Sequence, residues 1–100
     1  MGDKTFFTVM IESVEPEHSF IQLFWTYGNH AGEAIEGVLR ACSHLGIRNP
    51  IASEADDFDF NLLPDNVVHD KKLNVFYARG RNYFLTEESF IAPFGIIKAG

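Results

Sequence analysis

GNHAGEAIEGVLRACSHLGI, residues 28–47, is the stretch that decides the fold, because its apolar residues recur at the spacing of an amphipathic helix. Plotted as a helix, these apolar side chains fall within about 140°, the width of a core-facing stripe. They are Ala31, Ile35, Val38, Leu39, Cys42 and Leu45. The opposite side is polar, with Glu33, Glu36, Arg40, Ser43 and His44. We therefore expect this helix to cover one face of a sheet.

Both ends of the predicted helix carry local signals. Gly28-Asn29-His30 ends the preceding strand and opens the helix. Gly46 accepts the left-handed conformation that ends many helices, and the apolar Ile47 then packs back onto the last turn. We expect the helix to end at about Leu45.

Two strands precede the helix, and each alternates between two sets of side chains. In residues 5–14 the sets are Phe7, Val9 and Ile11 against Phe6, Thr8 and Met10. In residues 19–27 they are Ile21, Leu23, Trp25 and Tyr27 against Phe20, Gln22, Phe24 and Thr26. The break between the two strands, residues 15–17, is short and favours an antiparallel pair.

The chain after the helix gives weaker signals. Residues 48–70 lose periodicity, so we expect a loop with at most one short strand. Residues 73–78 and 82–86 predict a β-hairpin, because the glycine of Arg79-Gly80-Arg81 would supply the positive φ of a tight turn. A last strand is expected around residues 94–97.

These elements predict an α+β fold. We expect a single domain over residues 1–100, with an antiparallel sheet of four or five strands and the amphipathic helix on one face, in the order ββαβββ. The alternative is a ferredoxin-like βαββαβ arrangement, in which residues 59–68 form a second helix.

Composition and charge argue against several classes of protein. The net charge of −6 disfavours nucleic-acid binding, which needs a positive face. The longest nearly apolar run, residues 20–25, is far shorter than the roughly 20 residues of a membrane span. Cys42 is the only cysteine, and the N-terminus lacks the pattern of a secretory signal. We expect a cytoplasmic protein with neither a membrane nor a nucleic acid as partner.

No motif in the sequence predicts a catalytic, cofactor or metal site. Cys42 and His44 would point about 200° apart on a helix, so they cannot act as nucleophile and base. Cys42 is interpreted as a buried packing thiol. The four histidines lack metal-ligand spacing; they are His18, His30, His44 and His69. We expect no cofactor and no metal.

The acidic residues Asp56, Asp57 and Asp59 form the candidate binding site for a partner. Their density without matching cations nearby favours a surface held for a basic protein partner. The alternative interpretation is a loop that serves only solubility.

One helix cannot cover a whole sheet. A helix about 10 Å across shields roughly two or three strands spaced about 4.8 Å apart. We expect it to pack on Phe7, Val9, Ile11, Leu23, Trp25, Val75 and Tyr77. The other face would then display Phe6, Met10, Phe20, Phe24, Phe76 and Phe84. A monomer rarely leaves so apolar a face exposed to water. Either residues 48–70 and the C-terminal tail fold over it, or a second copy of the chain covers it. We expect the second, a homodimer that forms through these six residues.

The function expected from these features is a non-catalytic protein-interaction module with an acidic surface, such as an inhibitor, an immunity-like protein or a regulatory subunit. The alternative is a small enzyme or small-molecule-binding protein with an aromatic-lined pocket. Its polar groups would come from His30, His69, Tyr77 or Tyr83. A deep pocket with converging polar groups would favour the alternative, and a flat face would favour the module.

Overall fold

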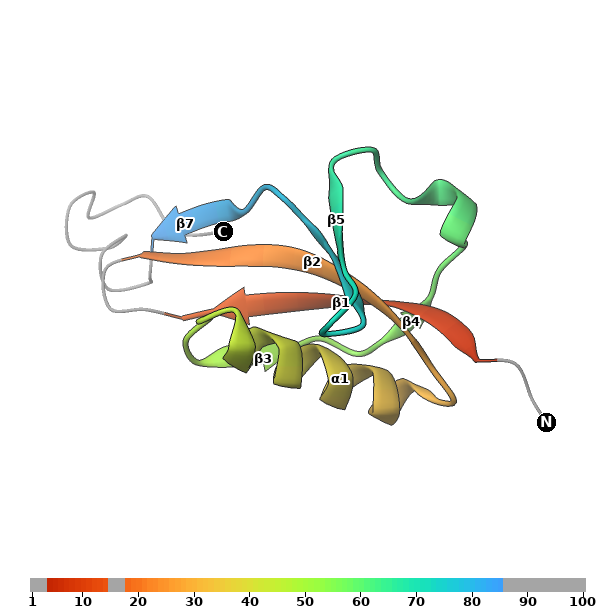
Figure 1. The fold of residues 1–100 in the computed structure, drawn as a ribbon. Coiled ribbons are helices and arrows are strands. Elements are labelled where there is room, and N and C mark those ends of the chain that lie inside the picture. Colours follow the sequence, from red (N-terminus) through yellow and green to blue (C-terminus); the bar gives the residue numbers. More distant parts are fainter. Residues whose placement is uncertain (1–3, 15–17, 86–100) are drawn as a thin grey trace.

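The computed structural model describes residues 4–14 and 18–85, which form one antiparallel sheet with a helix across it (Figure 1). In chain order the elements are β1 (Thr5–Ser13), β2 (His18–Gly28), α1 (Ala31–His44), β3 (Pro50–Ala52), β4 (Asp56–Asp57), the 3-10 turn η1 (Phe60–Leu62), β5 (Val67–Asp70), β6 (Val75–Ala78) and β7 (Asn82–Leu85). The α+β fold with an antiparallel sheet and one helix is thus confirmed for the described residues.

The sheet has seven strands where four or five were expected, because two of its rows are made of two strands each. The order across the sheet is β3-β1-β2-β6-β5. β4 pairs with β1 further along the edge that β3 occupies, and β7 pairs with β2 further along the edge that β6 occupies. The expected order ββαβββ has three strands after the helix, whereas the described residues form five there, β3 to β7.

The start of α1 agrees with the sequence prediction. The Nδ1 atom of His30, the residue before the first turn, accepts a hydrogen bond from the backbone N–H of Glu33 at 3.2 Å. Glu33 in turn accepts one from the backbone N–H of Asn29 at 2.6 Å. The first bond satisfies a donor that a helix start leaves free, and the second ties the residue before the cap to the first turn. The bond from Asn29 also holds the pKa of the Glu33 carboxyl below its usual value, because it stabilises the carboxylate.

The end of α1 is the glycine stop expected from the sequence. Gly46 has a φ of 76°, in the left-handed region. The backbone N–H of Ile47 then donates to the carbonyl of Cys42 at 2.9 Å, and that of Gly46 donates to Ser43 at 3.3 Å. Ile47 is buried and packs in the core, so the chain turns back beneath the helix.

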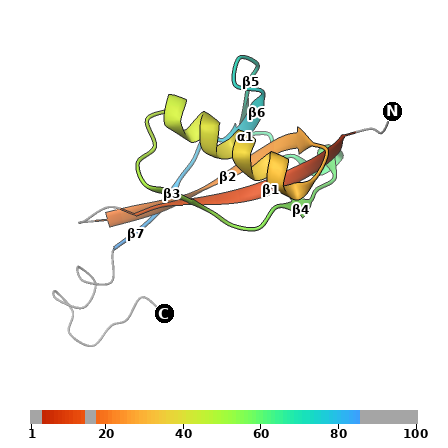
Figure 2. The ribbon, with the colours of Figure 1, turned by 90° about the horizontal axis from the view of Figure 1, so that it is seen from below.

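Figure 2, seen from below, shows α1 lying across the sheet. The main core lies between α1 and the sheet. Val9 and Ile11 of β1, Phe24 of β2 and Val38 of α1 are fully buried. Burial of each such side chain stabilises the fold by roughly 1.5–3 kcal/mol. The rest of this core consists of Phe20, Ala41, Cys42, Ile47 and Val75.

The register of β1 with β2 shows that the side chains of β2 were assigned to the wrong faces of the sheet. Val9 lies opposite Phe24, and residues opposite each other in an antiparallel pair share a face. Phe20 and Phe24 therefore lie on the helix side, at 7% and 0% exposure, and do not belong to the open face on which they were expected. Leu23 and Trp25, which were expected beneath the helix, lie on the other face.

Two buried polar side chains of β2, Gln22 and Thr26, explain why the pattern of polar and apolar residues in this strand indicated the wrong face. Gln22 donates from Nε2 to the carbonyl of Ala78 at 2.7 Å and accepts at Oε1 from Nε of Arg81 at 3.0 Å. The hydroxyl of Thr26 donates to the carbonyl of Asn74 at 2.9 Å. Satisfied in this way, polar residues can lie beneath the helix.

Residues 48–70 contain more regular structure than the expected loop. β3 and β4 run along the outer edge of β1, and β5 pairs with β6. Where the ferredoxin-like alternative needs a second helix, the chain forms only the single turn η1. That alternative is therefore wrong.

The hairpin expected around Gly80 is also wrong. β6 and β7 pair one after the other with β2, not with each other, and Gly80 has no positive φ. The hairpin in this region joins β5 to β6, and Asn74, with a φ of 60°, is the left-handed residue of its turn. The strand expected at residues 94–97 lies outside the described residues.

Cys42 is buried in the core, as the helical pattern predicts. Burial raises the pKa of its thiol from 9.0 to about 11, because the thiolate would lose its hydration. The thiol is therefore a packing group at neutral pH.

We expect Cys42→Ala to lower the free energy of unfolding by about 1–2 kcal/mol at neutral pH, because it deletes a buried group. Since the thiol's pKa is higher in the folded than in the unfolded chain, the wild type loses stability as the pH rises from 9.0 to about 11. Its advantage over the variant should shrink across that window. Urea unfolding of both proteins at neutral pH and between the two pKa values measures this, and rapid labelling of the native thiol would contradict the burial.

Candidate interaction surface

One end of the sheet face opposite the helix is covered by aromatic side chains. Phe6 and Trp25 are buried there. The segment after β4 lays Phe60 against Phe6 and Phe58 against Trp25, with ring centroids 5.3 and 5.7 Å apart. Phe76 of β6 completes the cluster, 5.8 Å from Phe60. The aromatic residues at this end therefore form a second, smaller core.

The other end of this face is exposed. Met10, Leu23 and Ile51 are 41%, 40% and 55% exposed. Met10 of β1 lies opposite Leu23 of β2. Glu12 of β1 lies between Ile51 of β3 on one side and the half-buried Ile21 of β2 on the other. We name Met10, Ile21, Leu23 and Ile51 the open-face patch. It is an apolar surface over three adjacent strands, with the Glu12 carboxylate among its side chains.

A hollow of about 300 Å³ adjoins this patch. β2 lines it with Ile21, Leu23 and Trp25, and Pro64 and Asn66 line it from the loop before β5. The remaining lining comes from Ala78, Gly80, Arg81 and Asn82. A hollow of this size beside exposed apolar side chains can take one anchoring side chain of a partner protein.

The residues predicted for self-association are divided between different places. Of those whose side chains the structure describes, Met10 alone is exposed on the face opposite the helix. Phe6 and Phe76 belong to the aromatic cluster on that face, and the two phenylalanines of β2 lie beneath the helix. The side chain of Phe84 lies outside the described residues. Ile21 and Leu23 were missed because the face of β2 was assigned wrongly, and Ile51 was missed because residues 48–70 were expected to form mainly a loop.

The predicted acidic site does not form one cluster. Asp56 and Asp57 are successive residues of β4, so their side chains lie on opposite faces of the sheet. Asp59 accepts a hydrogen bond at Oδ1 from the backbone N–H of Asn61, at 2.9 Å, and so caps η1. All three carboxylates are exposed, but only Asp56 shares a face with Glu12. Their role in binding stays a prediction.

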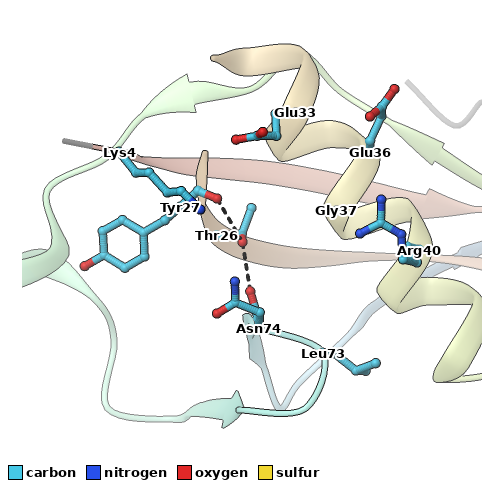
Figure 3. A pocket seen from close by; sticks show the side chains of 9 residues that line it. All are labelled: Lys4, Thr26, Tyr27, Glu33, Glu36, Gly37, Arg40, Leu73 and Asn74. Carbon is cyan, nitrogen blue, oxygen red and sulfur yellow. Dashed lines mark hydrogen bonds between the residues drawn. The ribbon is translucent and has the colours of Figure 1, made fainter. Parts of the chain in front are cut away.

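A second hollow, which we name the helix cleft, lies between α1 and the turn from β5 to β6 (Figure 3). Its volume is about 290 Å³. Its charged lining residues are Lys4, Glu33, Glu36 and Arg40. Thr26 and Asn74, joined by a hydrogen bond of 2.9 Å, lie on the side of the cleft opposite the helix.

The polar groups expected in an aromatic-lined pocket do not converge. His30 caps α1, and His69 stacks on Phe76 with ring centroids 4.0 Å apart. Tyr77 and Tyr83 contact different phenylalanines of β2, at ring-centroid distances of 5.7 and 5.6 Å. These four residues line neither the helix cleft nor the hollow beside the patch.

The described residues contain neither a cluster of metal ligands nor a membrane-spanning helix. In residues 4–14 and 18–85, no three His, Cys, Asp or Glu side chains lie close enough together to hold a metal ion. Within the same ranges, no helix has the length and apolarity that a membrane span requires. No family model, no curated protein and no solved structure matches the chain.

We expect Asp59→Ala to lower the free energy of unfolding by about 1 kcal/mol, the typical effect of losing a side-chain cap. The cap holds the turn whose Phe60 covers Phe6. Asp57→Ala is the matched control, because it removes a charge of the same acidic stretch but leaves the cap, and its effect should stay below about 0.5 kcal/mol. Urea unfolding compares the two variants, and equal losses would show that the cap does not stabilise the turn.

Proposed function

We propose that this protein is a non-catalytic protein-interaction module, of the inhibitor, immunity-like or regulatory-subunit kind, which binds its partner through the open-face patch. The supporting observation is the exposure of three large apolar side chains, Met10, Leu23 and Ile51, on adjacent strands of one face. Removing them from water is favourable by about 25 cal/mol per Å² of apolar area buried, and the entropy cost of association offsets part of this gain. The hollow beside Leu23 offers the partner an anchoring point.

Glu12 and Asp56 define the chemistry of this partner. Glu12 lies between Ile21 and Ile51, and Asp56 lies on the same face at the edge of the sheet. The whole chain carries a net charge of −6. The patch therefore fits a segment with apolar side chains and at least one Lys or Arg that reaches Glu12. Such charge complementarity accelerates association and selects the orientation of binding.

The alternative, an enzyme or a small-molecule-binding protein with an aromatic-lined pocket, has less support. The rings on the face opposite the helix pack against one another and do not line a cavity. The polar residues expected for such a pocket lie on different parts of the molecule. A largely flat apolar face is the feature that favours a protein partner.

We expect Leu23→Asp to abolish capture of the partner by the tagged full-length chain from its own cells. Leu62→Asp is the matched control, because Leu62 is even more exposed but belongs to η1 and not to the patch. The comparison is made by quantifying the proteins retained by the wild type and by each variant. A protein retained by the wild type and by Leu62→Asp, but lost with Leu23→Asp, supports the proposal. If Leu23→Asp retains all that the wild type retains, the patch is not the interface.

We also propose a homodimer as the alternative occupant of this patch, in which a second copy of the chain would take the place of the partner protein. This retains the predicted homodimer on the face opposite the helix, with the corrected residues. Met10 and Leu23 lie opposite each other, so a twofold axis near this pair would bring the same apolar side chains of two copies together.

Sedimentation at micromolar concentration is expected to give a species of twice 11.3 kDa, and Met10→Asp combined with Leu23→Asp should return it to the monomer mass. Phe24→Asp is not a suitable probe, since Phe24 is fully buried beneath the helix and the variant should unfold. A wild type that sediments as a monomer would remove the homodimer and leave the proposal of a different partner protein untouched.

A further inference from the structure

The helix cleft is separate from the open-face patch, because it lies on the helix side of the sheet (Figure 3). Four parts of the chain meet there: Lys4 just before β1, the end of β2, one side of α1, and the turn from β5 to β6. Its volume of about 290 Å³ lies just below the usual range for ligand sites, roughly 300–1,000 Å³. A ligand of about the size of one amino acid fits such a space.

Charges of both signs line this cleft. Glu36 and Arg40 lie about one turn apart on α1, and Lys4 lies across from Glu33 (Figure 3). In Figure 3, Thr26 is the donor of every hydrogen bond drawn between the lining residues, and backbone carbonyl oxygens accept them. The four charges are thus not bonded to one another, and a ligand that carries both signs can meet complementary groups on one surface.

The two carboxylates have different tasks. Glu33 is engaged at the helix start, where Oε1 accepts from the backbone N–H of Asn29 at 2.6 Å and Oε2 from its side-chain amide at 3.4 Å. Glu36 lines the cleft further along the helix and is exposed, so its carboxylate is the one left for an ammonium group. Arg40 offers a planar guanidinium, which binds a carboxylate through two parallel hydrogen bonds.

Gly37 gives the cleft its room. It lies in the middle of α1, where glycine destabilises a helix relative to alanine. Packing does not require a glycine there, because a Cβ atom added at Gly37 would meet no atom within 4 Å. Gly37 lines the cleft, so a side chain at this position would occupy the space that a ligand needs.

The side of the cleft facing the helix is held in place before any ligand binds. Thr26 is almost fully buried, and its hydroxyl donates to the carbonyl of Asn74 at 2.9 Å, which fixes the β5–β6 turn against β2. A surface that is already ordered loses little entropy on binding.

From these observations we propose that the helix cleft binds a small zwitterion of the amino-acid class, with its ammonium group at Glu36 and its carboxylate at Arg40. This inference does not depend on the open-face patch, and it assigns the chain a small ligand in addition to its protein partner.

The first experiment titrates the full-length protein with each of the common amino acids and follows backbone amide signals by NMR. We expect at least one amino acid to bind with a Kd of about 1 mM or tighter and to shift the signals of Thr26 and Asn74. Acetate and methylammonium serve as probes with a single charge and should bind at least about tenfold more weakly. The absence of saturable shifts with every amino acid, or equal affinity for acetate or methylammonium, would overturn the proposal.

The second experiment repeats the titration on variants with the amino acid that binds. Glu36→Gln and Arg40→Gln should each weaken binding by at least about tenfold, and Gly37→Leu should abolish it. The matched controls Glu54→Gln and Arg48→Gln change the same charges at exposed positions outside the cleft, and should bind as the wild type does. Gly37→Leu should also resist urea better than the wild type, which separates a filled cleft from a damaged fold. Wild-type binding by Glu36→Gln, Arg40→Gln or Gly37→Leu would refute the assignment.

Discussion

The pairing of β1 with β2 in a single register, Val9 opposite Phe24, is the constraint on which the rest of the structure depends. Because side chains alternate along a strand, a slip of one residue would move every side chain of β2 to the other face of the sheet. The observed register places Phe24 beneath the helix and Leu23 on the opposite face. The main core, the aromatic cluster and the open-face patch all follow from that one alignment.

The elements that could be predicted from the sequence are those whose signals are local. The helix depends on its own periodicity and on the stop at Gly46 and Ile47, so its bounds were predicted closely. The antiparallel pair of β1 and β2 follows from two alternating segments and a short break. In both cases, residues close together in the chain contain the information.

The features that could not be predicted depend on partners far away in the sequence. Gln22 and Thr26 read as solvent-facing, but they are buried because the carbonyl groups of Ala78 and Asn74 accept their hydrogen bonds. The strands after the helix have four residues or fewer, too few to establish a period. Leu23 of the open-face patch was also missed, because β2 was assigned to the faces of the sheet the wrong way round. The alternation along each strand does not say which residues of β1 and β2 lie opposite each other, so the pairing of Ser13 with Phe20 is known only from the register.

The outer edge of β1 has a further consequence for how copies of the chain meet. That edge is occupied by two short strands, and the first, β3, begins with Pro50, which has no N–H to offer a neighbouring strand. The second, β4, consists of the exposed Asp56 and Asp57, which repel an identical edge. Edges built in this way resist the strand-by-strand growth that leads to aggregation. At this side of the sheet, the acidic residues of a chain with ten phenylalanines therefore oppose edge-to-edge pairing of its copies.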